Sequence, residues 1–87
     1  MILLVTYELK GPPGSYADLF NTLKSQHGWW HYMRATWLVS TDSTPQELFE
    51  LLKPHIKQND RILVTRLGDR QGWLPKAAWD WIRKNSR

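Results

Sequence analysis

The amino-acid sequence predicts an α+β fold in which strands and helices follow the order βαββαβ, with a further helix at the C-terminus. Two observations predict it: short apolar or aromatic runs typical of strands, and segments with helical spacing of apolar residues behind a capping signal. The predicted segments are residues 2–8, 16–26, 29–33, 36–41, 45–53 and 61–67. This order is that of the ferredoxin-like split fold, which predicts a four-stranded antiparallel sheet of order 4-1-3-2.

The first strand and the first helix are separated by a stiff loop. Residues 2–7 are almost continuously apolar, as expected for a central strand that is covered on both faces. The Gly-Pro-Pro-Gly run at 11–14 can continue neither a strand nor a helix. Ser15 and Asp18 have the spacing of a capping box, which predicts a helix start at this point. Gly28 is placed to end that helix.

The middle of the sequence predicts a hairpin and a second helix. Arg34 and Ala35 form the turn between the two aromatic strands. Thr44 and Glu47 have capping-box spacing, with a proline at the first helical position between them. Pro54 cannot donate a helical hydrogen bond, so we expect the regular helix to stop beside it.

The chain continues beyond the minimal split fold. We expect residues 1–87 to form a single domain, with residues 73–87 as a C-terminal helical extension whose helix spans 75–84. Trp73 and this helix should pack against the sheet or a partner, because their apolar side chains would otherwise form an exposed patch.

Tryptophan is unusually frequent, with six residues in the chain. Trp29 and Trp30 are adjacent on one predicted strand, so their side chains should point to opposite faces of the sheet. One is expected in the helix-packed core and the other beneath the C-terminal segment. Aromatic side chains on such a sheet can also stack on single-stranded bases, but packing in the core or in an interface is the favoured interpretation.

Composition limits the classes of function. The chain has no cysteine, which excludes disulfides and thiolate metal sites. No run approaches the length of a membrane span, and the strand-like start differs from a secretory leader, so we expect a cytoplasmic protein without a membrane partner. The net charge of +4 divides into −2 for residues 1–52 (three basic, five acidic) and +6 for residues 53–87 (nine basic, three acidic). This polarity favours an anionic partner, although a solvated surface with a basic tail remains the alternative.

Three segments resemble the Cas2 proteins of CRISPR systems and the related VapD-type toxins: residues 3–8, 36–47 and 59–67. The chain also resembles a group of small bacterial proteins, sometimes labelled SinR-like, that share Gly-Trp-Trp-His-Tyr at 28–32 and Gly-Trp-Leu-Pro at 72–75. The resemblance implies a ferredoxin-like homodimer that binds or cleaves DNA or RNA. The chain departs from the Cas2 pattern in having Glu8 where Cas2 has Asp, and a predicted helix in place of a fifth strand.

Glu8 is the candidate catalytic residue and metal ligand. A carboxylate at the end of a central strand could approach its symmetry mate in a dimer and hold Mg²⁺, the one cofactor considered. The alternative is a solvated strand end or an ion pair with Lys10. Basic residues on or beside predicted loops and strand ends are candidate phosphate contacts: Lys10, Arg34, Arg61, Arg66, Arg70 and Lys76.

The leading functional hypothesis is therefore a Cas2-like nucleic-acid-binding protein with metal-dependent nuclease activity as an added prediction. The alternative is a non-catalytic, dimeric protein-interaction or assembly module. A basic stripe on the surface would favour the first hypothesis, and an exposed aromatic patch would favour the second. A small-ligand or nucleotide sensor would require a deep pocket.

Overall fold

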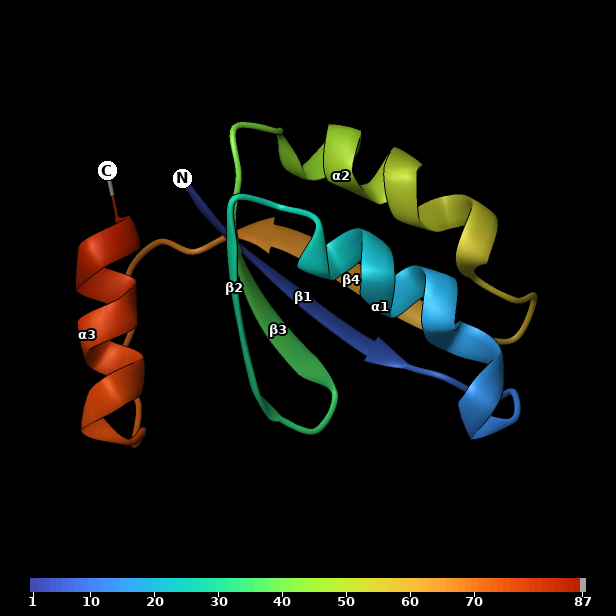
Figure 1. Ribbon diagram of the computed structural model, residues 1–87, viewed down its shortest axis with the longest axis horizontal. Helices are drawn as coiled ribbons and strands as arrows, with labels where there is room; N and C mark the ends of the chain where they lie inside the picture. Colours follow the sequence, from blue (N-terminus) through green and yellow to red (C-terminus); the bar gives the residue numbers. More distant parts are fainter. Residues whose placement is uncertain (87) are drawn as a thin grey trace.

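The computed structural model describes residues 1–86 and shows a small α+β domain built on a four-stranded antiparallel sheet (Figure 1). The strands are β1 (Ile2–Glu8), β2 (Gly28–Met33), β3 (Thr36–Ser40) and β4 (Arg61–Arg66). The helices are α1 (Ala17–Lys24), α2 (Pro45–Leu52) and α3 (Lys76–Asn85), with short 3₁₀ helices η1 (Pro13–Tyr16) and η2 (Lys53–His55). The order of the strands across the sheet is β2-β3-β1-β4, as predicted, and the arrangement is compatible with a ferredoxin-like fold.

Helices α1 and α2 cover one face of the sheet. Strand side chains that point to this face, such as Val5 and Trp37, are fully buried against helical leucines such as Leu19 and Leu48. The main core therefore lies between the sheet and these two helices, where about nine large side chains are removed from water.

Helix α3 covers only part of the opposite face. It stands apart from α1 and α2, and the segment that follows β4 leads to it (Figure 1). Ala78 and Ile82 of α3 pack against Ile2, Trp30 and Leu38 of the sheet, which forms a second, smaller core. The predicted docking of the C-terminal helix on the sheet is confirmed.

Trp73 does not take part in this docking. Its side chain is 99% exposed, so the prediction that Trp73 packs against the sheet is wrong. Trp73 belongs to the segment between β4 and α3, where Leu67 and Leu74 pack against the second core and Trp73 instead points into solvent. A contact between Trp73 and a partner stays a prediction.

The start of α1 differs from the capping box predicted at Ser15 and Asp18. Residues Pro13–Tyr16 form η1, and the Ser15 hydroxyl donates to the Pro12 carbonyl at 2.7 Å. The α-helix begins only at Ala17, without a side-chain cap. Because the two prolines fix their own backbone φ angles, the chain enters a tight 3₁₀ turn before the α-helix. Gly28 is not a cap either, since α1 ends at Lys24 and Gly28 begins β2.

The start of α2 is as predicted. The Thr44 hydroxyl accepts the Glu47 backbone N–H at 3.1 Å, and the Glu47 carboxylate accepts the Thr44 N–H at 2.8 Å. The helix gives way to η2 at Lys53, beside Pro54, for the predicted reason that proline lacks the N–H of a continuing helix.

The two adjacent tryptophans of β2 point to opposite faces of the sheet, as predicted. Trp30 is buried beneath α3. Trp29 lies on the other face, where its ring centroid is 5.5 Å from that of Trp37. Because β2 is an edge strand, Trp29 is only partly covered and remains 41% exposed, so the prediction that it lies in the helix-packed core is wrong.

Candidate functional site

Glu8 lies at the C-terminal end of β1, opposite Arg61 of β4. Its Oε1 atom is 2.9 Å from Nζ of Lys10, and both side chains are more than half exposed. The hydrogen bond from Lys10 and its charge lower the pKa of Glu8, so this carboxylate is ionised at neutral pH. Within residues 1–86, no three His, Asp or Glu side chains gather as a metal site would require. In a single chain Glu8 is thus the anion of an ion pair with Lys10.

Three of the predicted phosphate contacts lie at the same end of the sheet as Glu8. Lys10 follows β1, and Arg61 begins β4, which runs antiparallel to β1. Arg34 lies in the turn between β2 and β3. The Tyr7 backbone N–H donates to the Ala35 carbonyl at 3.1 Å, which holds this turn beside the end of β1. The topology therefore brings together cations that are far apart in the sequence.

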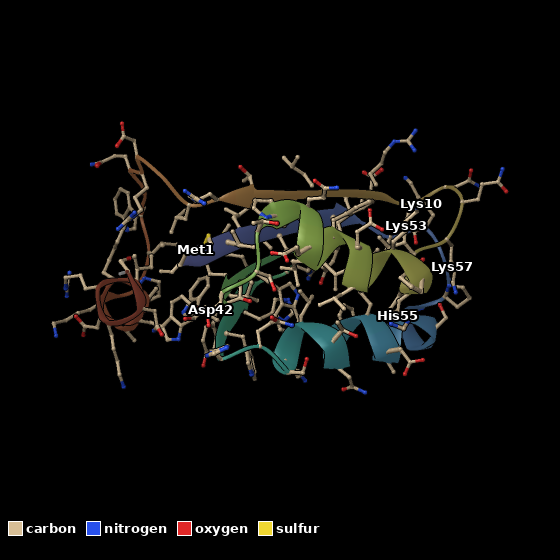
Figure 2. All side chains as sticks on the ribbon, turned by 90° about the horizontal axis from the view of Figure 1, so that it is seen from above. Met1, Lys10, Asp42, Lys53, His55 and Lys57 are labelled. Atoms are coloured by element: carbon tan, nitrogen blue, oxygen red, sulfur yellow. The ribbon has the colours of Figure 1, made fainter. Side chains whose placement is uncertain are left out.

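Two lysines that the sequence analysis missed join this group. Lys53 and Lys57 belong to the connection between α2 and β4, and Figure 2 shows them with Lys10 and His55 at the end of the molecule remote from α3. Their location depends on how α2 returns the chain to the sheet, which spacing in the sequence does not reveal. We call this group the basic end: Lys10, Arg34, Lys53, Lys57 and Arg61.

The other three predicted contacts lie elsewhere. Arg66 and Arg70 are at the opposite end of the sheet, where both line a cavity of about 350 Å³ beside Ile2. Lys76 begins α3 and forms an ion pair with Asp80 at 3.2 Å. The six predicted residues therefore do not form one continuous surface.

A buried carboxylate organises the loops of the basic end. Asp60 accepts the backbone N–H of Lys10 at 2.7 Å and that of Lys57 at 2.9 Å. The Tyr16 hydroxyl donates to the same carboxylate at 2.9 Å and accepts the Gly11 N–H at 2.8 Å. One side chain thus joins three segments of the chain and fixes the backbone of two lysines of the basic end.

These hydrogen bonds decide the ionisation of Asp60. Burial by itself raises the pKa of this carboxyl, but the backbone N–H groups of Lys10 and Lys57 and the Tyr16 hydroxyl together outweigh burial and lower it. Burial also raises the pKa of Tyr16, and the neighbouring Asp60 carboxylate adds to this effect. Asp60 is therefore a structural anion. The only signal in the sequence was an aspartate in a turn directly before a strand, a position where its side chain often bonds to nearby backbone groups.

The aromatic side chains near β2 serve mainly to build the domain. The His31 ring stacks on Trp37 with centroids 3.9 Å apart, and the Trp37 indole N–H donates to the Tyr7 hydroxyl at 3.0 Å. These contacts support the interpretation of Trp37 as a core residue. His27, directly before β2, is separate from this packing, and its Nε2 atom lies 3.7 Å from Oδ2 of Asp42.

An apolar pocket of about 300 Å³ lies on the open face of the sheet, at the edge of the area that α3 covers. Its walls include Leu4, Trp30 and Trp79, and the exposed Trp73 lines it together with Arg70. No single motif predicted this pocket, because its walls come from the sheet, the connecting segment and α3.

Comparisons of the chain with protein-family models, with curated proteins and with solved structures give no match. Among the helices of residues 1–86, none is long and apolar enough to cross a membrane.

Proposed function

We propose that the protein is a ferredoxin-like, Cas2-like domain that binds nucleic acid by contacting phosphates with its basic end. The observation that carries this proposal is the balance of charge there. Of its five cations, only Lys10 forms an ion pair with a carboxylate among residues 1–86. Arg34 and Arg61 are without such a partner, as are Lys53 and Lys57. Lys57 Nζ lies 5.0 Å from the centroid of the Tyr16 ring, a contact that leaves its positive charge in place. Cations that lie near one another without carboxylate partners are suited to contact a polyanion.

The carboxylates near the basic end offset only part of its positive charge. Glu8 is neutralised by Lys10, and Asp60 is buried and faces backbone N–H groups. Asp18 lines a shallow cavity with His55 and Lys57. The positive charge that remains predicts contacts to the phosphate backbone, which fix the position of a nucleic acid without reading its sequence.

Metal-dependent cleavage requires more metal ligands than a single chain provides at this site. Glu8 is the one predicted metal ligand, and it is already paired with Lys10. The described residues therefore do not by themselves fit a Mg²⁺ site, and we assign no catalytic step. The nuclease prediction requires a homodimer in which two copies of Glu8 approach one another.

A homodimer is the second part of the proposal. Leu63 of β4 is 59% exposed and Met33 of β2 is 46% exposed, and both lie on the face opposite α1 and α2. Part of this face is covered by α3, and a second copy of the chain would cover the part around Leu63 of β4. The same exposed apolar side chains favour the alternative function, a non-catalytic assembly module.

The proposed function is tested by measuring the fluorescence anisotropy of labelled DNA and RNA over a range of salt concentrations. Binding through the basic end predicts that log K falls linearly with log salt, with a slope near −0.7 to −0.9 for each phosphate contacted. Replacing Arg34 and Arg61, the two arginines of the basic end, should weaken binding to all sequences alike and reduce the slope by about one unit per lost contact. Absence of binding to either nucleic acid at low salt would contradict the proposal and favour the assembly module.

A further inference from the structure

The apolar pocket has an exposed tryptophan at its edge. Trp73 lines it, yet its side chain is 99% exposed and contributes almost nothing to the core. Leu4, Trp30 and Ile82 form part of the wall behind it. Its indole projects into solvent at the edge of the apolar pocket, so the faces of the ring are open for a planar ligand to stack on.

Arg70 places positive charge at the same pocket. Its guanidinium donates to the Gly68 carbonyl at 3.0 Å and to the Ser86 hydroxyl at 3.4 Å, so it is held in place within the chain. A guanidinium has five N–H donors, so others remain for a ligand. Arg70 also lines the neighbouring cavity of about 350 Å³, together with Arg66.

Arg66 and Arg70 have no carboxylate within ion-pair distance in the described part of the chain. The two cavities share Arg70 and Leu67, so an apolar space and a basic space adjoin one another. A ligand that fits both has a flat apolar ring joined to an anionic group.

We propose that the apolar pocket takes one unpaired base of a single-stranded nucleic acid, stacked on Trp73, while an adjacent phosphate contacts Arg66 and Arg70. This inference rests on the proposed function and names its ligand class. A base within a duplex is stacked and paired on both sides, whereas a single strand can turn a base outward onto an aromatic side chain. At about 300 Å³ the pocket is at the small end of the range for ligand sites, which suits one ring system.

The experiment compares three probes at one salt concentration: a short oligothymidylate, an abasic oligomer of the same length, and thymidine monophosphate. The abasic oligomer retains the phosphates and lacks the bases. Stacking predicts that the oligothymidylate binds about 5-fold or more tightly than the abasic oligomer. Thymidine monophosphate should bind far more weakly than the oligomer, because it lacks the additional phosphates.

Two alanine variants locate the effect. Trp73→Ala should weaken oligothymidylate binding about 5-fold or more and leave abasic binding unchanged. Tyr32→Ala is the matched control, because Tyr32 is 80% exposed and does not line this pocket. Since Trp73 is not part of either core, its replacement should leave the melting temperature unchanged.

Equal affinity for the oligothymidylate and the abasic oligomer would overturn the base pocket and leave the proposed function intact. Failure to bind either oligomer at low salt would overturn both. If thymidine monophosphate bound as tightly as the oligomer, the site would take a free nucleotide and the single-strand assignment would be wrong. A homodimer that shields Trp73 from an aqueous fluorescence quencher would also overturn it, because the second copy would occupy the pocket.

Discussion

The Asp60 carboxylate accepts the backbone N–H of Lys10 at 2.7 Å, across fifty residues of sequence. It also accepts the N–H of Lys57 at 2.9 Å, so a single anion fixes the backbone of two cations of the basic end. Stability of the fold and the placement of the proposed phosphate contacts therefore depend on the same side chain.

The variant Asp60→Asn should be less stable than the wild type at neutral pH. The amide keeps the size of the carboxylate but loses its charge, and the backbone N–H groups of Lys10 and Lys57 lose a charged acceptor. We expect the melting temperature to fall by about 5 °C or more. Asp18→Asn is a suitable control, because Asp18 is exposed and its side chain accepts no hydrogen bond in residues 1–86.

The same variant predicts a pH dependence. The pKa of Asp60 is lower in the folded chain than in the unfolded chain, where it is about 3.9. Its stabilising effect is therefore complete above that value and is lost as the pH falls through the folded pKa. The difference in melting temperature between wild type and Asp60→Asn should be constant from pH 7 to about 5 and shrink below about 4. A difference that stays the same at low pH would contradict this ionic role.

The docking of α3 predicts a large effect of Ile82→Ala. Ile82 of α3 is buried against Trp30 and Leu38 of the sheet, so its truncation should lower the free energy of unfolding by about 2–5 kcal/mol. Truncation of the chain after Gly72 should lower the melting temperature further or cause aggregation, because Trp30 and Ile2 would lose their cover. Chemical denaturation checks both variants, and unchanged stability and solubility of the truncated chain would count against the docking.

The part of the sheet that α3 leaves uncovered, around the exposed Leu63 of β4, is the expected site of self-association. Leu63→Glu introduces a charge into this face and should convert a homodimer into a monomer in sedimentation experiments at micromolar concentration. Leu51→Glu is the matched control, since Leu51 is exposed to a similar degree but belongs to α2. If the wild type sediments as a monomer at this concentration, the prediction of a homodimer is wrong.

Glu8→Gln separates binding from cleavage. The substitution removes a negative charge and releases Lys10 from its ion pair, so nucleic-acid affinity should stay the same or increase. Any Mg²⁺-dependent cleavage should disappear, because the predicted metal ligand is lost. A gel-based cleavage assay beside a binding titration measures both, and cleavage that persists in Glu8→Gln would exclude Glu8 as the catalytic residue.

Much of the fold could be predicted from local patterns. The capping box of Thr44 and Glu47 and the stop at Pro54 depend on neighbours in the sequence, and both are as predicted. The start of α1 could not be predicted as well. Ser15 has the residue type of a cap, but the preceding prolines impose a 3₁₀ turn that uses its hydroxyl. A local signal failed there because a second local constraint was stronger.

The candidate site was less predictable because it is made by topology. Lys10, Arg34 and Arg61 were found from their positions beside predicted strand ends. Lys57 and Asp60 were missed, because their importance depends on contacts with residues more than forty positions away, such as the 2.9 Å bond from the Tyr16 hydroxyl to Asp60. Periodicity and capping signals describe neighbours in sequence and contain no such contacts.

The central claim, that the basic end binds the phosphates of nucleic acid, is tested most directly by two charge-matched double variants. Lys53→Gln with Arg61→Gln removes two cations of the basic end, and Lys24→Gln with Lys84→Gln removes two cations of α1 and α3. Both variants have the same net charge, so a difference in their affinity for nucleic acid shows which part of the surface contacts the phosphates. Anisotropy titrations over a salt series should show weaker binding and a slope reduced by about two units for the first variant only. Equal loss of affinity in both variants, or none in either, would contradict the account.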